Sequence, residues 1–134
     1  MTRAFLDSNV LVYAFTDCDP RQERALELLE RGHLISVQCL NEFANVASRK
    51  LGIGWDRVAQ SLDEIRVLCP DIRLLDLRTH ALGLEMARLH RFSVWDAMIV
   101  AAALVAGCET LYSEDMHAGL VVDGRLTIVN PFAA

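Results

Sequence analysis

The sequence predicts a three-layer α/β/α domain in which helices cover both faces of a central, mainly parallel β-sheet. Short apolar runs alternate with longer amphipathic segments along the chain, which is the order of parallel strands joined by helical crossovers. The opening run, residues 4–6, is apolar at consecutive positions. Such a run is typical of a strand that is buried on both faces.

The opening strand is expected to end at Asp7, where polar residues interrupt the apolar run. Asp19 then has the position of a helix N-cap, with Pro20 at the first helical position. Apolar residues then follow at helical spacing, and Gly32 is expected to end the helix. The sequence therefore predicts a helix over residues 20–31.

The middle of the chain repeats the strand–helix alternation. Residues 34–37 have the composition of a second strand, and residues 72–75 that of a third. Apolar residues recur at helical spacing in the segments between and after these strands. The helices that this spacing predicts span residues 39–50, 55–68 and 77–90.

The last third begins with a helix over residues 94–106, opened by Ser93. It is apolar on nearly every side, and such a helix lies in the centre of a domain. A fourth strand is expected at residues 109–112 and a late strand at residues 126–129. We found neither an internal repeat nor a linker, so 134 residues with 53% hydrophobic composition predict a single domain, 1–134.

Composition excludes several classes of protein. The longest apolar run, residues 97–106, is far shorter than the roughly 18 residues that cross a bilayer, so no membrane association is expected. A charge at Asp7 precedes any possible signal-peptide core, which favours a cytoplasmic location. The four cysteines form no C-x-x-C pair and, like the four histidines, have no zinc-ligand spacing. We therefore expect reduced, mostly buried cysteines.

The net charge is −5, from 13 basic and 18 acidic residues. A chain this acidic does not bind nucleic acid through its overall charge. It would need a local basic surface, or metal ions held by its own carboxylates. The basic residues are almost all arginines, and Lys50 is the only lysine.

Four acidic residues lie where a predicted strand ends or its following helix begins. They are Asp7, Glu42, Asp96 and Asp115. Because parallel strands carry their ligand sites at their carboxyl ends, these side chains are expected at one edge of one sheet. Clustered carboxylates repel one another unless a cation joins them. Hard oxygen ligands suit Mg²⁺ or Mn²⁺, and such sites hydrolyse phosphodiesters.

Each of these residues also has a purely structural explanation. Asp7 fits a strand-to-helix turn, and Asp115 fits a loop. Asp96 follows Ser93 at the spacing of a capping box. Glu42 suits the first turn of its helix, where the helix dipole favours a negative charge. The functional interpretation depends on the joint placement of the four residues.

Five segments of the sequence resemble the PIN domain, in particular the VapC-type toxins of bacterial toxin–antitoxin pairs. They are residues 5–13, 41–42, 92–103, 111–116 and 126–132. The resemblance covers essentially the whole chain. It implies a PIN-like fold and a Mg²⁺- or Mn²⁺-dependent endoribonuclease that cleaves RNA. It also implies a small cognate antitoxin and a homodimer.

The resemblance also implies roles for the acidic quartet, Asp7, Glu42, Asp96 and Asp115. Asp7, Asp96 and Asp115 would bind the metal, and Glu42 would bind it or position the attacking water. The family pattern favours Asp115 over the adjacent Glu114, which stays open as a contributor. The residues expected to give polar support to the site are Asn9, Ser113 and Glu114.

Three alternatives were considered. Phosphoacceptor receiver domains and aspartate-nucleophile phosphatases resemble this chain in having a carboxylate after the first strand. Both also use a lysine late in the chain, and here the only lysine is Lys50. The third alternative is a PIN-fold module that binds RNA or protein without catalysis.

Overall fold

The computed structural model describes residues 3–133, so the outermost residues of the expected domain 1–134 lie outside the described part. Four strands form a sheet in the order β1-β4-β6-β5. The first three pair in parallel, and β5 pairs with β6 in the antiparallel sense. These strands are β1 (Phe5–Leu6), β4 (Thr110–Tyr112), β5 (Val121–Val122) and β6 (Leu126–Val129).

Two further strands, β2 (Ile35–Ser36) and β3 (Ile72–Arg73), form a second parallel pair. A parallel bridge between Phe5 and Leu34 joins this pair to β1. Leu34 donates to the Ala4 carbonyl and accepts from the Leu6 amide, both at 2.9 Å. The strands therefore line up as one mainly parallel sheet, as predicted.

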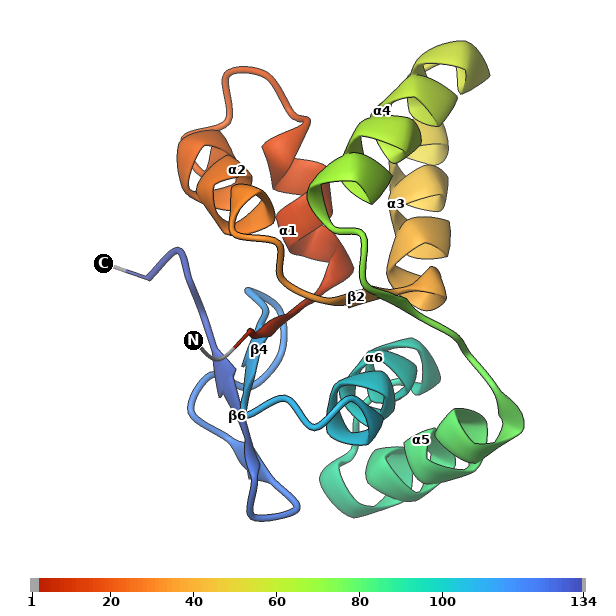
Figure 1. Ribbon diagram of the computed structural model, residues 1–134, viewed down its shortest axis with the longest axis vertical. Helices are drawn as coiled ribbons and strands as arrows, with labels where there is room; N and C mark the ends of the chain where they lie inside the picture. Colours follow the sequence, from red (N-terminus) through yellow and green to blue (C-terminus); the bar gives the residue numbers. More distant parts are fainter. Residues whose placement is uncertain (1–2, 134) are drawn as a thin grey trace.

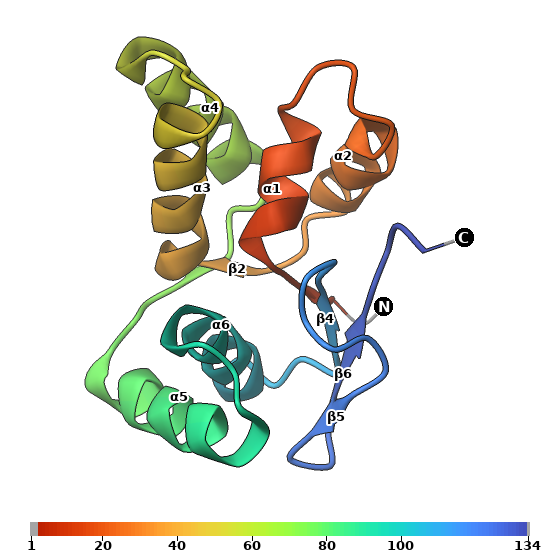
Figure 2. The same ribbon diagram turned by 180° about the vertical axis from the view of Figure 1, so that it is seen from behind.

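Helices cover both faces of these strands. Figures 1 and 2 show one group of helices on one side of the strands and a second group on the other, which confirms the expected three layers. The first group comprises α1 (Ser8–Ala14), α2 (Gln22–Glu30), α3 (Val37–Arg49) and α4 (Trp55–Leu68). The second group comprises α5 (Leu77–His90) and α6 (Val94–Val105).

Helix α6 is central, as its apolar composition predicted. Residues 97–104 are all buried, and they pack into a core with fully buried strand residues such as Phe5, Leu111 and Ile128. Ser93 begins the helix by accepting a hydrogen bond from the Asp96 amide at 3.1 Å. The core thus holds the amino end of α6 at the same edge as the ends of the strands.

Helix α1 was not predicted. Its apolar residues include Val10 and Val12, and valine is more typical of strands than of helices. The helix forms because Asp7 caps it, accepting from the Ser8 amide at 2.6 Å, and because its inner face is buried. Strand β5 was also not expected.

The predicted start of the second helix was wrong. Helix α2 begins at Gln22, and the Asp19 carboxylate accepts from the Arg21 amide at 2.8 Å, so Asp19 closes a turn before the helix. Helix α3 begins two residues earlier than expected, because Ser36 caps it. Strands β2 and β3 are also shorter than predicted.

The four cysteines are free, and three of them are buried. Within residues 3–133, every helix is too short or too polar to cross a bilayer.

Candidate functional site

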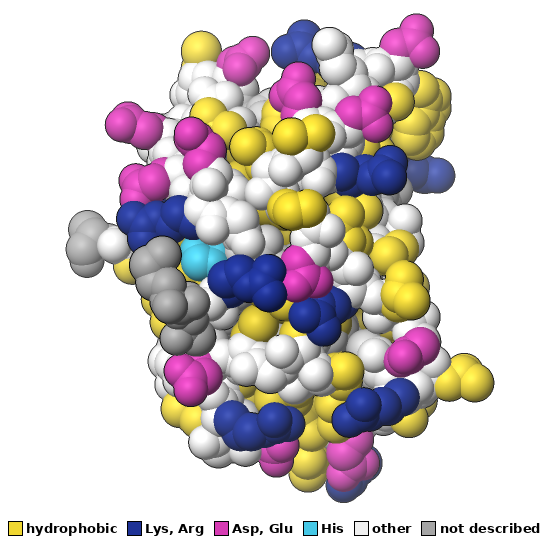
Figure 3. All heavy atoms as spheres, viewed as in Figure 1, with side chains coloured by type: hydrophobic (Ala, Val, Ile, Leu, Met, Phe, Trp, Pro, Cys, Tyr) yellow, Lys and Arg dark blue, Asp and Glu magenta, His cyan; other side chains and the backbone are white. Residues whose placement is uncertain are grey.

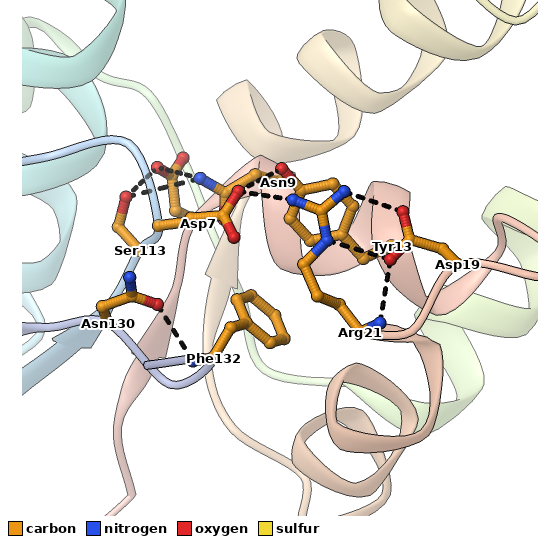
Figure 4. Close-up of polar contacts among 9 residues, drawn as sticks. Asp7, Asn9, Tyr13, Asp19, Arg21, Ser113, Asn130 and Phe132 are labelled. Carbon is orange, nitrogen blue, oxygen red and sulfur yellow. Dashed lines mark hydrogen bonds and ion pairs between the residues drawn. The ribbon is translucent and has the colours of Figure 1, made fainter. Parts of the chain in front are cut away.

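Asp7 lies at the carboxyl end of β1 and is 97% buried, since only 3% of its surface is exposed. Its Oδ2 atom accepts a hydrogen bond of 2.6 Å from the Ser113 hydroxyl and a longer one of 3.4 Å from the Asn9 amide. Its Oδ1 atom accepts from the Ser8 amide at 2.6 Å. Figure 4 shows Ser113, Asp7 and Asn9 directed toward one another. Asn9 and Ser113, which were expected to give polar support to the site, therefore both contact Asp7.

Burial raises the pKa of Asp7 to about 7, and the neighbouring charges of Asp96 and Glu42 add to this rise. The hydrogen bonds from Ser113 and Ser8 oppose it, because they favour the charged form. The neutral form of the Asp7 carboxyl therefore persists to a higher pH than that of an exposed aspartate. A cation beside it would favour the charged form.

Glu42 lies in the second turn of α3, not in the first as expected, because the helix begins at Val37. Its Oε1 atom accepts from the Ser8 hydroxyl at 2.7 Å, and its Oε2 atom accepts from the Gln38 amide at 2.8 Å. The Ser8 hydroxyl also lies 3.3 Å from Asp7 Oδ1. Ser8 therefore stands between the two carboxylates, a role that the sequence did not reveal.

Asp96 lies in the first turn of α6 with its carboxylate partly exposed. Desolvation raises its pKa, and the charges of Glu42 and Asp115 raise it further. Asp115 is exposed in the loop after β4. The Asp96 amide donates to the Ser93 hydroxyl, so the cap uses the backbone of Asp96. A hydrogen bond from the Ser93 side chain partly opposes the rise in the pKa of the carboxyl.

The structure thus brings the predicted quartet into one electrostatic group. The charges of Asp96 and Glu42 raise the pKa of Asp7, and the charges of Glu42 and Asp115 raise the pKa of Asp96. Glu42 and Asp96 also line the same hollow of about 480 Å³ between α3 and the start of α6. Asp7, Glu42 and Asp96 therefore lie near one another at one end of the sheet, and Asp115 is close enough to Asp96 to raise its pKa.

The donor chemistry of this group fits a hard divalent cation, because every candidate ligand atom is oxygen. The amide oxygen of Asn9 is buried and has no hydrogen-bond partner among the described residues, which leaves it available to a water or an ion. However, within residues 3–133 no three acidic, histidine or cysteine side chains are arranged as a ready-made metal site.

Glu114 has a different environment from Asp115. Its carboxylate accepts from the Tyr13 hydroxyl at 2.5 Å and pairs with the Arg21 guanidinium at 2.7 Å. Arg21 lies 3.6 Å above the Tyr13 ring and forms two further bonds to the Asp19 carboxylate. Figure 4 shows Arg21 between Tyr13 and Asp19. Glu114 is thus held in a structural cluster with Tyr13 of α1 and with Arg21 and Asp19, which lie in the turn before α2.

The fold and these positions define an α/β domain with an acidic group at the carboxyl edge of its parallel sheet. The model of the PIN domain matches residues 4–118. The chain therefore belongs to the PIN domain family.

Several solved structures share this fold. The match to a chain of a toxin–antitoxin complex from Klebsiella pneumoniae covers 98% of this chain and 99% of that one, with a TM-score of 0.71 and 19% identity. VapC20 of Mycobacterium tuberculosis is described as a sarcin–ricin loop cleaving toxin. The match covers 84% of this chain and 89% of the VapC20 chain, with a TM-score of 0.69 and 20% identity. The match to FitAcB of Neisseria gonorrhoeae covers 98% of this chain and 99% of the FitAcB chain, with a TM-score of 0.67 and 18% identity. No curated protein sequence matches significantly.

Proposed function

We propose that this protein is a Mg²⁺- or Mn²⁺-dependent endoribonuclease that hydrolyses RNA phosphodiester bonds. The observation that carries the proposal is the Ser8 hydroxyl between the Asp7 and Glu42 carboxylates, with Asp96 lining the same hollow as Glu42. Asp115 is near enough to raise the pKa of Asp96, and a cation would relieve the repulsion among these groups. Membership of the PIN family and the description of VapC20 as a sarcin–ricin loop cleaving toxin support RNA as the substrate.

In this proposal Asp7, Asp96 and Asp115 hold the cation, and Glu42 holds it or orients the attacking water. A bound divalent ion supplies an activated water and neutralises the charge that develops on the phosphate. Ser113, with Ser8, fixes the Asp7 carboxylate through the 2.6 Å bonds. Glu114 takes no part, since its charge is paired with Arg21.

We further propose that the protein is the toxin of a type II toxin–antitoxin pair, acting in the cytoplasm as a homodimer restrained by a small antitoxin. The fold shared with a toxin–antitoxin complex from Klebsiella pneumoniae supports this assignment. Large apolar side chains also remain exposed on two helices, with Val67 of α4 at 79% and Leu77 of α5 at 85%. Exposed apolar surface of this kind suits contacts with other chains.

A PIN-fold module that binds RNA or protein without catalysis is the second candidate. The observation in its favour is that residues 3–133 hold no ready-made metal site. Cleavage itself separates the two candidates, since a binding module leaves RNA intact.

The test is incubation of a mixed RNA pool with the purified protein, in Mg²⁺ or Mn²⁺ and in EDTA. We expect cleavage with the metal and none in EDTA. Asp96→Asn should abolish cleavage while the protein stays folded, because the cap uses the Asp96 amide, which Asn retains. Undiminished cleavage by a folded Asp96→Asn protein would remove Asp96 from the site. Intact RNA under every condition would favour the binding module.

A further inference from the structure

The acidic site opens into a hollow of about 480 Å³ beside α3. Glu42 and Asp96 line it at one end, together with the indole of Trp95. Asn41 and Asn45 of α3 form another part of its wall. The hollow thus continues directly from the carboxylates along the exposed face of α3, which lies next to α6 in both ribbon views (Figures 1 and 2).

A second hollow, of about 490 Å³, is also lined by Asn41 and Asn45. Arg49 and Trp55 complete its far side. Because the two hollows share both asparagines, they adjoin along α3, and we call them together the α3 groove. It runs from Trp95 beside the carboxylates to Trp55 at the start of α4.

The two tryptophans of the chain are both in this groove. Trp95 is 64% exposed and Trp55 is 68% exposed. Indole rings bury more apolar area than almost any other side chain, so most proteins pack them. Here both rings present a large part of their surface to the groove or to solvent. An occupant with flat, stackable groups would cover them.

Between the two tryptophans the groove is polar. Asn41, Asn45 and Arg49 follow at intervals of four residues, so they lie in one row along α3. Each amide offers donors and an acceptor, which is what hydrogen bonding to the edge of a nucleic acid base requires. A second copy of the chain or an apolar helix would leave these amides unmatched.

On these grounds, and resting on the proposed function, we propose that the α3 groove holds a single-stranded stretch of the RNA substrate. Its bases stack on Trp95 and Trp55, and their edges face Asn41 and Asn45. Aromatic stacking needs unpaired bases, as in the single-stranded sites of RNA-binding proteins. The strand would then enter the acidic site from the Trp95 end.

Stacking must supply most of this binding, because the groove contains little positive charge. The net charge is −5, and Arg49 is the only cationic side chain that lines the described hollows of this groove. On the face shown in Figure 3, basic and acidic side chains are interspersed and form no broad basic surface. With about one phosphate contact, binding should depend only weakly on salt, with a log–log slope of roughly −0.7.

The test measures binding in EDTA, so that it does not depend on cleavage. Tryptophan fluorescence would be titrated with a ten-nucleotide adenosine RNA, with an abasic ribose-phosphate chain of the same length, and with duplex RNA. The single strand should quench the fluorescence, since both tryptophans report on the groove. The abasic chain and the duplex should bind much more weakly. Equal binding of the abasic chain, or no quenching at all, would overturn the proposal.

Variants assign the effect to the groove. Trp95→Leu and Trp55→Leu should each weaken binding of a labelled single strand by roughly 5- to 150-fold, the range for losing one stacked base. Leu89→Ala is the matched control, because Leu89 is exposed on α5 and lines neither of the hollows that form the groove. Its affinity should equal that of the wild type. Wild-type affinity in both tryptophan variants would exclude the groove.

The outcomes for the groove and for the nuclease remain distinct. Base-dependent binding without cleavage in Mg²⁺ or Mn²⁺ would support the groove and remove the proposed catalysis. Cleavage with metal, but without base-dependent binding in EDTA, would support the nuclease and overturn the groove. If the tryptophan variants instead dissociate a homodimer and the single strand causes no quenching, the groove belongs to a second copy of the chain.

Discussion

The Ser8 hydroxyl donates a hydrogen bond of 2.7 Å to the Glu42 carboxylate, and so joins the start of α1 to α3. The same hydroxyl lies 3.3 Å from Asp7 Oδ1. Ser8 thereby contacts both repelling carboxylates, Glu42 through its hydroxyl and Asp7 through its backbone amide at 2.6 Å. These bonds hold Glu42 and Asp7 on either side of one residue.

Replacing Ser8 by alanine should destabilise the protein by about 1.5 kcal/mol in EDTA, because Glu42 loses a hydrogen bond to a charged, partly buried group. Urea unfolding measures the loss. Ser48→Ala is the control, since the Ser48 hydroxyl bonds only carbonyls of its own helix, and alanine is a good helix former. Equal stability of the two variants would show that the Ser8 bond contributes nothing.

Glu114 and Asp115 should respond to substitution in opposite ways. Glu114→Ala removes the ion pair with Arg21 and the bond from Tyr13, and should cost about 1 kcal/mol of stability while leaving RNA cleavage nearly unchanged. Asp115→Asn should leave stability unchanged and abolish cleavage. Urea unfolding and the cleavage assay, applied to both variants, check this. If Glu114→Ala alone lost cleavage, the roles assigned to these neighbours would be reversed.

His33 should make stability depend on pH. Its Nδ1 atom accepts from the Ala4 amide at 2.9 Å, which requires the neutral ring. Burial lowers the pKa of His33 below 6.5, and the charges of Arg31, Arg24 and Arg3 lower it further. The unfolded chain therefore binds more protons, so the contribution of His33 is complete above about pH 6.5 and is lost as the pH falls toward the lower folded pKa.

Asp7 acts in the opposite direction, because its pKa is raised on folding. The two effects separate when wild type is compared with His33→Asn, which keeps Asp7 unchanged. The stability advantage of wild type should shrink between pH 7 and pH 5, measured by urea unfolding. A constant difference across this range would mean that His33 does not titrate differently on folding.

The fold was predicted well where long periodic segments decide it. The bounds of α4 and α5 were predicted to the residue, and α6 nearly so, because Ser93 provides a cap and apolar residues continue for three turns. Helix α1 was missed, because seven residues rich in valine and leucine carry no helical period distinguishable from a strand. Capping by Asp7 and burial formed the helix instead.

The positions of the carboxylates along the chain could be interpreted from the sequence, but their partners could not. Asp7 and Asp115 follow strands and Asp96 lies in the first turn of a helix, so one edge of a parallel sheet was the expected place for them. The shared site itself stays a prediction. The Ser8 bond to Glu42 spans 34 residues, and the Glu114 pair with Arg21 spans 93. Such contacts depend on how helices pack, which no local pattern records. The burial that shifts the Asp7 pKa has the same origin.

The proposed cation site, shared by the four carboxylates, can be tested without knowledge of the substrate. Ionising Asp7 above its pKa of about 7 costs the fold roughly 4 kcal/mol relative to the unfolded chain. At pH 8 in EDTA, Asp7→Asn should therefore melt at a higher temperature than wild type. As the pH falls toward 5, Asp7 takes up its proton and this difference should shrink.

Thermal melts of wild type and Asp7→Asn, each in EDTA and in excess Mg²⁺ at matched ionic strength, are the decisive measurement. At about 100 times its dissociation constant, a bound ion stabilises the folded wild type by roughly 2.7 kcal/mol, which is several degrees for a domain of this size. Asp7→Asn should gain much less. If Mg²⁺ raises neither melting temperature and Asp7→Asn only destabilises the protein, Asp7 serves as a helix cap and the shared cation site does not exist.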